Sequence, residues 1–182
     1  PTLDAELGPV ERAFAVFETT PVAAASLGQA HRARLPSGER VVVKVQRPGI
    51  RSLVHTELQA LEVVAGWAMR LRFIRRRADV PALLAEFSAL LWEELDYTHE
   101  AHNVDLFQQL FAADKGVYIP RVYRDYSTQR VLTLEDVTAI KITDYNRIEA
   151  AGVDRRDVAH RLISSYLWMV FKQRVFHADP HP

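Results

Sequence analysis

The sequence contains no cysteine, and this absence removes several kinds of chemistry together. Disulfide bonds, thiolate metal sites and a thiol nucleophile are all excluded. The chain also lacks an excess of charge of either sign, because Lys plus Arg and Asp plus Glu both number 23. A protein that holds nucleic acid through its overall charge is therefore not expected.

Long apolar runs are missing as well. The longest is about seven residues, VVAGWAM at positions 63–69, whereas a transmembrane helix needs roughly 20. The N-terminal stretch PTLDAELGPV has neither the basic nor the apolar segment of a signal peptide. With 48% hydrophobic and 25% charged residues among 182, the composition is that of one globular domain, or a large part of one, with a sizeable core.

Hydrophobic periodicity predicts a β-hairpin near the N-terminus. Residues 3–17 are expected to form short helical turns that bring Phe14 and Phe17 to one core. The β-branched run RVVVKVQ follows the turn sequence PSGE at residues 36–39 and predicts two antiparallel strands around that turn.

Beyond the hairpin, the pattern is mostly helical. We predict one helix over residues 51–74 and a second that Pro81 opens and that runs to about residue 112. Further along, the sequence predicts two short strands at 117–119 and 130–134, a short helix ending at Gly152, and a final helix with Asp154 as its N-cap. This order of elements indicates an α+β protein.

Lys44 lies inside the valine-rich run VVVKV. Strand alternation places it with Val42 on the face opposite Val43 and Val45. One interpretation is a lysine that faces water on an edge strand and discourages aggregation. The other is a lysine that holds phosphate oxygens, as the strand lysine of protein kinases does.

A loop of small residues precedes this lysine by about 20 positions. Small side chains let a backbone approach phosphate groups closely, although alanine resists positive φ more than glycine does. An ordinary turn or a small packed patch is the alternative. The loop residues are Ala23, Ala24, Ala25 and Ser26, followed by Gly28.

The segment EELDYTHEAHN at residues 93–103 is rich in carboxylates on a predicted helix. A solvated helix face is the default interpretation of such charges. Glu94 has leucine neighbours, however, and a partly buried carboxylate needs a cationic partner. Lys44 is the candidate partner, and the sequence does not choose between Glu94 and Glu100.

The C-terminal stretch RVFHADPHP contains His177, Asp179 and His181. The two histidines are four positions apart, which suits two metal ligands only on a helix. Pro180 and Pro182 prevent a regular helix here, so no metal site is predicted. Asp179 can instead accept a hydroxyl proton, as the aspartate of a kinase catalytic loop does. A surface turn is the alternative.

Five segments together resemble the UbiB family of atypical protein-kinase-like proteins. In chain order they are PVAAASLGQAHRA, VVVKVQRPGI, EELDYTHEAHN, VLTLEDVTAIKITD and FHADPHP. The resemblance implies a protein-kinase-like fold with a small N-terminal β-hairpin lobe, inserted long helices and the start of a helical C-terminal lobe. We expect one truncated domain over residues 1–182, with the first lobe and hinge at about 1–140 and the second lobe at about 141–182.

The same resemblance implies roles for individual residues. The alanine-rich loop covers nucleotide phosphates, and Lys44 contacts them. Glu94 and Asp96 match an E-x-D motif, Glu100 is the other glutamate close behind it, and Asp179 is the catalytic-loop aspartate. The helix at 51–74 matches an insertion, since about 50 residues separate Lys44 from Glu94. The family's K-x-G-Q helix and its metal-binding Asn and Asp are expected outside this sequence, so the fragment by itself is expected to be inactive.

Function follows from the resemblance as an expectation. We expect ATP or ADP with Mg²⁺, and phosphoryl transfer to water or to a small lipid-like substrate in ubiquinone or related isoprenoid-quinone metabolism. A nucleotide-sensing scaffold without turnover and a purely helical interaction module are the alternatives. The expected location is cytoplasmic, with peripheral contact at the inner membrane. The arginine cluster RLRFIRRR at residues 70–77 either meets anionic lipid head groups there or is a solvated helix end.

Overall fold

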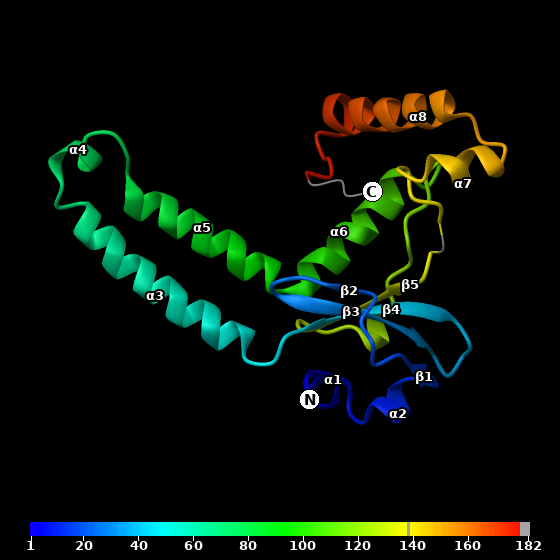
Figure 1. Cartoon of the computed structure of the whole chain (residues 1–182), viewed down its shortest axis with the longest axis horizontal. Helices are drawn as coiled ribbons and strands as arrows, with labels where there is room; N and C mark the ends of the chain where they lie inside the picture. The colour runs from blue at the N-terminus through cyan, green and yellow to red at the C-terminus, as the bar shows by residue number, and fades with distance from the viewer. Residues whose placement is uncertain (138, 179–182) are drawn as a thin grey trace. The chain divides into compact units, whose positions relative to one another are not determined.

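A computed structural model describes residues 1–137 and 139–178. The chain divides into two compact units (Figure 1). The first unit comprises residues 1–106 and 120–136, and the second comprises residues 107–119 and 137–182.

The first unit is built on an antiparallel sheet in which the strands are ordered β1-β3-β4-β5 and β2 also pairs with β3. The turn predicted at residues 36–39 is confirmed, since Arg34 lies opposite Arg40 at the hairpin end. Gly38 has a φ of 101° there, a value that favours glycine. The strands are β1 (Val16–Phe17), β2 (Ala23–Ala24), β3 (Gly28–Arg34), β4 (Arg40–Gln46) and β5 (Val131–Glu135).

Strand alternation gives the sheet two different faces. Val41 and Val43 are fully buried against the first helical turns, α1 (Thr2–Leu7) and α2 (Val10–Ala13), in a core that contains Phe14. Phe17 packs on the same core with its ring 5.6 Å from that of Phe14, as predicted, but it lies in β1 and not in a helical turn as expected. The intervening side chains of β4 are only partly buried and face the other way.

A helical hairpin follows β4. It comprises α3 (Ile50–Ala68), the short α4 (Arg72–Arg75) and α5 (Val80–Glu94), and α3 and α5 lie side by side in Figure 1. Ile50, Val54 and Leu58 recur at helical spacing and pack with Leu95, which explains why these two helices pair. The helix predicted over 51–74 ends earlier than expected, at Ala68, and a turn precedes α4.

The second predicted long helix is wrong in one respect. Instead of running from Pro81 to about 112, it breaks at Leu95 and Asp96, and a new helix, α6 (Tyr97–Leu110), begins. The Asp96 carboxylate accepts hydrogen bonds from the Thr98 amide and hydroxyl at 3.0 and 2.6 Å. Such an N-cap starts a helix, whereas apolar periodicity continues across the break and conceals it.

The strand predicted at 117–119 is also wrong. The Val117 amide bonds to the Asp114 carbonyl in a turn, and pairing with β5 occurs only at Val122, in a single bridge to Leu134. The strand predicted at 130–134 is β5, which follows a short 3₁₀ helix, η1 (Arg124–Tyr126).

The second unit contains α7 (Tyr145–Ala150), α8 (Arg155–Trp168) and a π-helical turn, η2 (Met169–Gln173). Asp154 caps α8 as predicted, since its carboxylate accepts from the Arg156 amide at 2.7 Å. Gly152, with a φ of 71°, lies just beyond the end of α7. In the described part of the chain, no helix combines the length and apolar character needed to cross a membrane. The boundary of two lobes near residue 140 stays a prediction.

Candidate functional site

A cavity of about 300 Å³ in the first unit brings together most of the residues that the sequence singled out. The alanine-rich loop forms one wall, and β4 and the α5–α6 junction contribute charged side chains. The lining residues are Ala23, Ala24, Ala25, Ser26, Leu27, Gly28, Gln29, Ala30, Val42, Lys44, Glu94, Tyr97 and Glu100.

Lys44 and Glu100 form an ion pair in this cavity. The lysine Nζ lies 2.7 Å from Oε1 and 2.6 Å from Oε2 of the glutamate, so both carboxylate oxygens accept from it. The two side chains are 36% and 39% exposed, which leaves the pair accessible from solution. A pair that is more than a third exposed stabilises a fold only modestly.

The structure resolves the choice between the two glutamates. Glu100 lies in the first turn of α6 and reaches Lys44. Glu94 is the last residue of α5, on the other side of the helix break, and lines the same cavity. The sequence did not decide between the two glutamates, because both were predicted to lie on one continuous helix.

Tyr97 belongs to the cavity although sequence reasoning missed it. The Lys44 Nζ lies 5.1 Å from the centroid of its ring. Burial raises the pKa of the Tyr97 hydroxyl to about 12, and the negative charges of Glu100 and Glu94 add to the effect. The spacing of three between Tyr97 and Glu100 was the available signal, since such residues share a helix face.

Gly28 allows the loop and α6 to approach each other. A Cβ atom at this position would lie 2.6 Å from the Tyr97 hydroxyl oxygen and 2.9 Å from the Val45 carbonyl oxygen. The second distance involves backbone, which cannot move aside easily. Only glycine therefore fits without displacing a wall of the cavity.

The alanine-rich loop is partly ordered by strand pairing. Ala23 and Ala24 form β2 opposite Ala30 and Gln29. Beyond them, the Ala25 amide donates to the Gly28 carbonyl at 2.9 Å, and the Arg47 Nε donates to the Ala25 carbonyl at 3.2 Å. These contacts hold small side chains along the cavity wall.

Asp96 does not line the cavity but fixes the helix that does. Partial burial acts to raise its pKa, yet the hydrogen bonds from the Thr98 hydroxyl and amide outweigh burial and hold the pKa below its ordinary value. The charged carboxylate therefore persists as the N-cap of α6, the helix that carries Tyr97 and Glu100.

The remaining predicted residues belong to the C-terminal stretch. Asp179 and His181 lie outside the described residues. His177 is described, and its backbone carbonyl accepts a hydrogen bond from the Tyr166 hydroxyl at 3.3 Å.

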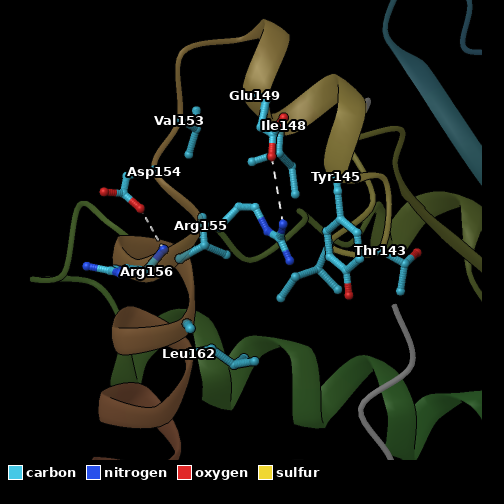
Figure 2. A pocket seen from close by; sticks show the side chains of 12 residues that line it. Thr143, Tyr145, Ile148, Glu149, Val153, Asp154, Arg155, Arg156 and Leu162 are labelled. Carbon is cyan, nitrogen blue, oxygen red and sulfur yellow. Dashed lines mark hydrogen bonds and ion pairs between the residues drawn. The ribbon is translucent and has the colours of Figure 1, made fainter.

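A larger hollow, of about 780 Å³, lies in the second unit (Figure 2). The figure shows Arg155 extended between Tyr145 and Glu149. Its guanidinium carbon lies 4.0 Å from the Tyr145 ring centroid, and its Nη1 lies 3.7 Å from the Glu149 carboxylate. The smaller cavity is the better candidate because it also contains the alanine-rich loop and Glu94, which this hollow lacks.

Known proteins similar to this chain match nearly its whole length. Protein ACTIVITY OF BC1 COMPLEX KINASE 7, chloroplastic, of Arabidopsis thaliana is 42% identical over 181 residues, which is 99% of this chain and 26% of that protein. Probable protein kinase UbiB of Azotobacter vinelandii is 34% identical over 173 residues, 95% of this chain and 32% of that protein. The chain thus spans about a quarter to a third of the length of these curated relatives.

A solved structure is similar in fold as well. The structure of Rv3197 from Mycobacterium tuberculosis in complex with erythromycin matches 80% of this chain and 36% of that chain, with a TM-score of 0.68 and 30% sequence identity. The predicted α+β, kinase-like fold is thereby confirmed. The family description "ABC1 atypical kinase-like domain" matches residues 2–182. The chain therefore belongs to the ABC1 family of atypical kinase-like proteins, which includes the UbiB relatives.

Proposed function

We propose that this protein binds a nucleotide, ATP or ADP, in the cavity around Lys44, and that the full-length protein transfers a phosphoryl group. The ion pair between Lys44 and Glu100 is the observation that carries the proposal. In kinases a strand lysine paired with a helix glutamate holds the α- and β-phosphates. Membership of a kinase-like family adds support.

Each wall of the cavity has a part in this proposal. Lys44 neutralises phosphate charge, and Glu100 keeps its ammonium group directed into the cavity. The small side chains of residues 23–26 let the loop backbone lie close to the phosphates. Glu94 lines the cavity near the pair and adds negative charge that a bound cation would offset.

Asp179 is proposed, from its sequence context, as the residue that orients a hydroxyl or water for in-line attack. Mg²⁺ bound to the phosphates would neutralise charge that develops during transfer. Among the described residues, no group of three or more potential ligands lies together, so we assign no metal position. The proposed acceptor is water or a small lipid-like molecule such as a quinone precursor.

A scaffold that senses nucleotide without turnover is the second candidate. The loop favours it, because Ala23, Ala24 and Ala25 adopt positive φ far less readily than the glycines of ordinary kinases. Both candidates require nucleotide binding and separate only on phosphate release.

We also propose a peripheral membrane contact at the tip of the helical hairpin, defined as residues 66–78. This tip contains five exposed arginines and no acidic residue. None of the arginines forms an ion pair within the described ranges 1–137 and 139–178. Trp67 and Phe73 are 62% and 63% exposed beside them. Aromatic rings among arginines suit the surface of an anionic bilayer.

Nucleotide binding tests the main proposal directly. We expect ATP or ADP with Mg²⁺ to raise the melting temperature of the wild-type chain, and Lys44→Met to abolish the shift because the phosphate contact is lost. Lys115→Met, which removes an exposed lysine outside the cavity, is the matched control and retains the shift. A wild-type chain that shows no shift with either nucleotide overturns the proposal.

A further inference from the structure

Gln46 is a buried polar side chain next to the candidate site. It is the last residue of β4 and is only 1% exposed. It follows Lys44 by two positions, so strand alternation places both side chains on the same face. Burying an amide is costly unless it forms hydrogen bonds, which makes its partners informative.

The side-chain amide of Gln46 donates two hydrogen bonds to backbone carbonyls. Nε2 lies 2.6 Å from the Leu95 carbonyl oxygen and 3.2 Å from that of Gln129. Leu95 is fully buried and is the C-cap of α5. Within the described chain the Gln46 Oε1 has no partner, so the two carbonyls alone set the orientation of the amide.

The Gln129 carbonyl also controls the start of α6. It accepts a second hydrogen bond, 3.0 Å long, from the backbone amide of Tyr97, the first residue of that helix. Leu95 and Tyr97 flank the helix break on either side. Gln46 therefore connects the end of β4 to both sides of the junction, one helical turn before Glu100.

We propose that Gln46 is a positioning residue that sets the distance between Lys44 and Glu100. Lys44 and Gln46 belong to one strand, whereas Glu100 belongs to the helix that the Gln46 amide secures. Loss of the two donors would let α6 shift from β4 and separate the ion pair. The consequence for nucleotide affinity rests on the proposed function, but the consequence for the ion pair does not.

The ion pair itself is tested by the chemical reactivity of Lys44. Gln46→Met keeps a similar volume and removes both donors. We expect labelling of Lys44 by an amine-reactive reagent, measured by mass spectrometry, to rise severalfold relative to the exposed Lys115 and Lys141. Unchanged Lys44 labelling in the folded variant overturns the proposal. Should this variant fail to fold, Gln46→Asn, which is one methylene too short to reach both carbonyls, carries the same expectation.

A matched control separates positioning from general destabilisation. Thr133 is fully buried on β5, and its hydroxyl donates to the Tyr126 carbonyl at 2.6 Å. It pairs with Val43, so it faces away from Lys44. Thr133→Val is expected to lower the melting temperature while leaving Lys44 labelling unchanged. If Lys44 labelling rose equally in the Gln46→Met and Thr133→Val variants, Gln46 would have a merely structural role.

A double-mutant cycle extends the test to binding. We expect Gln46→Met to weaken nucleotide binding about tenfold in the wild-type background, and less than twofold when Glu100 is already Gln, because no ion pair remains to be positioned. An equal loss in both backgrounds contradicts the proposal. A wild-type chain that binds no nucleotide contradicts the proposed function instead, and Lys44 labelling still decides the role of Gln46.

Discussion

At the scale of single residues, the cavity places charged side chains beside a buried tyrosine. Lys44 and Glu100 are 56 positions apart in the chain and compensate each other's charge. Tyr97 lies under the lysine, and its own hydroxyl stays neutral because a phenolate would be buried beside two carboxylates. The outcome is a lysine with a carboxylate partner in a cavity whose loop wall consists of small side chains.

Titration of Tyr97 provides a prediction at this scale. Its pKa is about 12, above the ordinary 10.0, so the folded state holds the proton more tightly than the unfolded state. The associated stability is fully present below pH 10 and is lost as the pH rises from 10 to 12. Ultraviolet absorbance should show a late phenolate transition that disappears in Tyr97→Phe. A Tyr97 that ionises at the ordinary pKa of a tyrosine side chain, 10.0, would contradict this account.

At the scale of elements, the approach of β3 to α6 depends on Gly28. We expect Gly28→Ala to destabilise the protein by about 1–3 kcal/mol, because its Cβ overlaps Tyr97 and the Val45 backbone. Gly66→Ala is the matched control. No atom lies within 4 Å of a Cβ placed there, and alanine in the interior of α3 should stabilise by about 0.5–1 kcal/mol. Urea unfolding measures the free energy of unfolding of both variants. Equal changes of the same sign would contradict the overlap of the Gly28→Ala Cβ with its neighbours as the cause.

The hairpin tip, residues 66–78, gives a second prediction for an element. Anionic vesicles of phosphatidylglycerol should bind the protein, and vesicles of phosphatidylcholine alone should not. Each arginine near such a surface contributes about 1 kcal/mol, so replacing Arg75, Arg76 and Arg77 by Ser should weaken binding roughly 100-fold. Added salt should weaken it as well, through screening.

Three exposed arginines elsewhere in the first unit, Arg12, Arg34 and Arg40, provide the control with the same change of charge. Replacing them by Ser should leave vesicle binding nearly unchanged. An equal loss in both triple variants would show that net charge alone drives binding. No binding of the wild type to anionic vesicles would remove the membrane contact altogether.

Elements also show what the sequence could predict. Period-two alternation placed Lys44 with Val42 correctly, and the PSGE turn set the hairpin register, because both are local patterns. The break at Leu95 and Asp96 escaped prediction, since apolar spacing runs through it and the cap depends on a single Asp–Thr contact. Tyr97 and Gln46 escaped for a different reason: their importance comes from partners distant in sequence, such as Gln129.

At the scale of the whole molecule, the proposed activity is divided between distant parts of the chain. The lysine and its glutamate belong to the first unit, whereas Asp179 follows the helices of the second. The chain spans about a quarter to a third of its curated relatives. Binding and turnover are therefore expected to respond to different substitutions, which makes them separable by experiment.

The full-length protein allows that separation. Asp179→Asn should leave nucleotide affinity within about twofold but lower phosphate release at least 100-fold, as expected for loss of a general base. Lys44→Met should lower both, because it removes a phosphate contact. Asp157→Asn, at an exposed position on α8, is the matched control and should change neither. Phosphate release that persists in Asp179→Asn would rule out this aspartate as the base. A wild-type protein that binds nucleotide but releases no phosphate would favour the nucleotide-sensing scaffold.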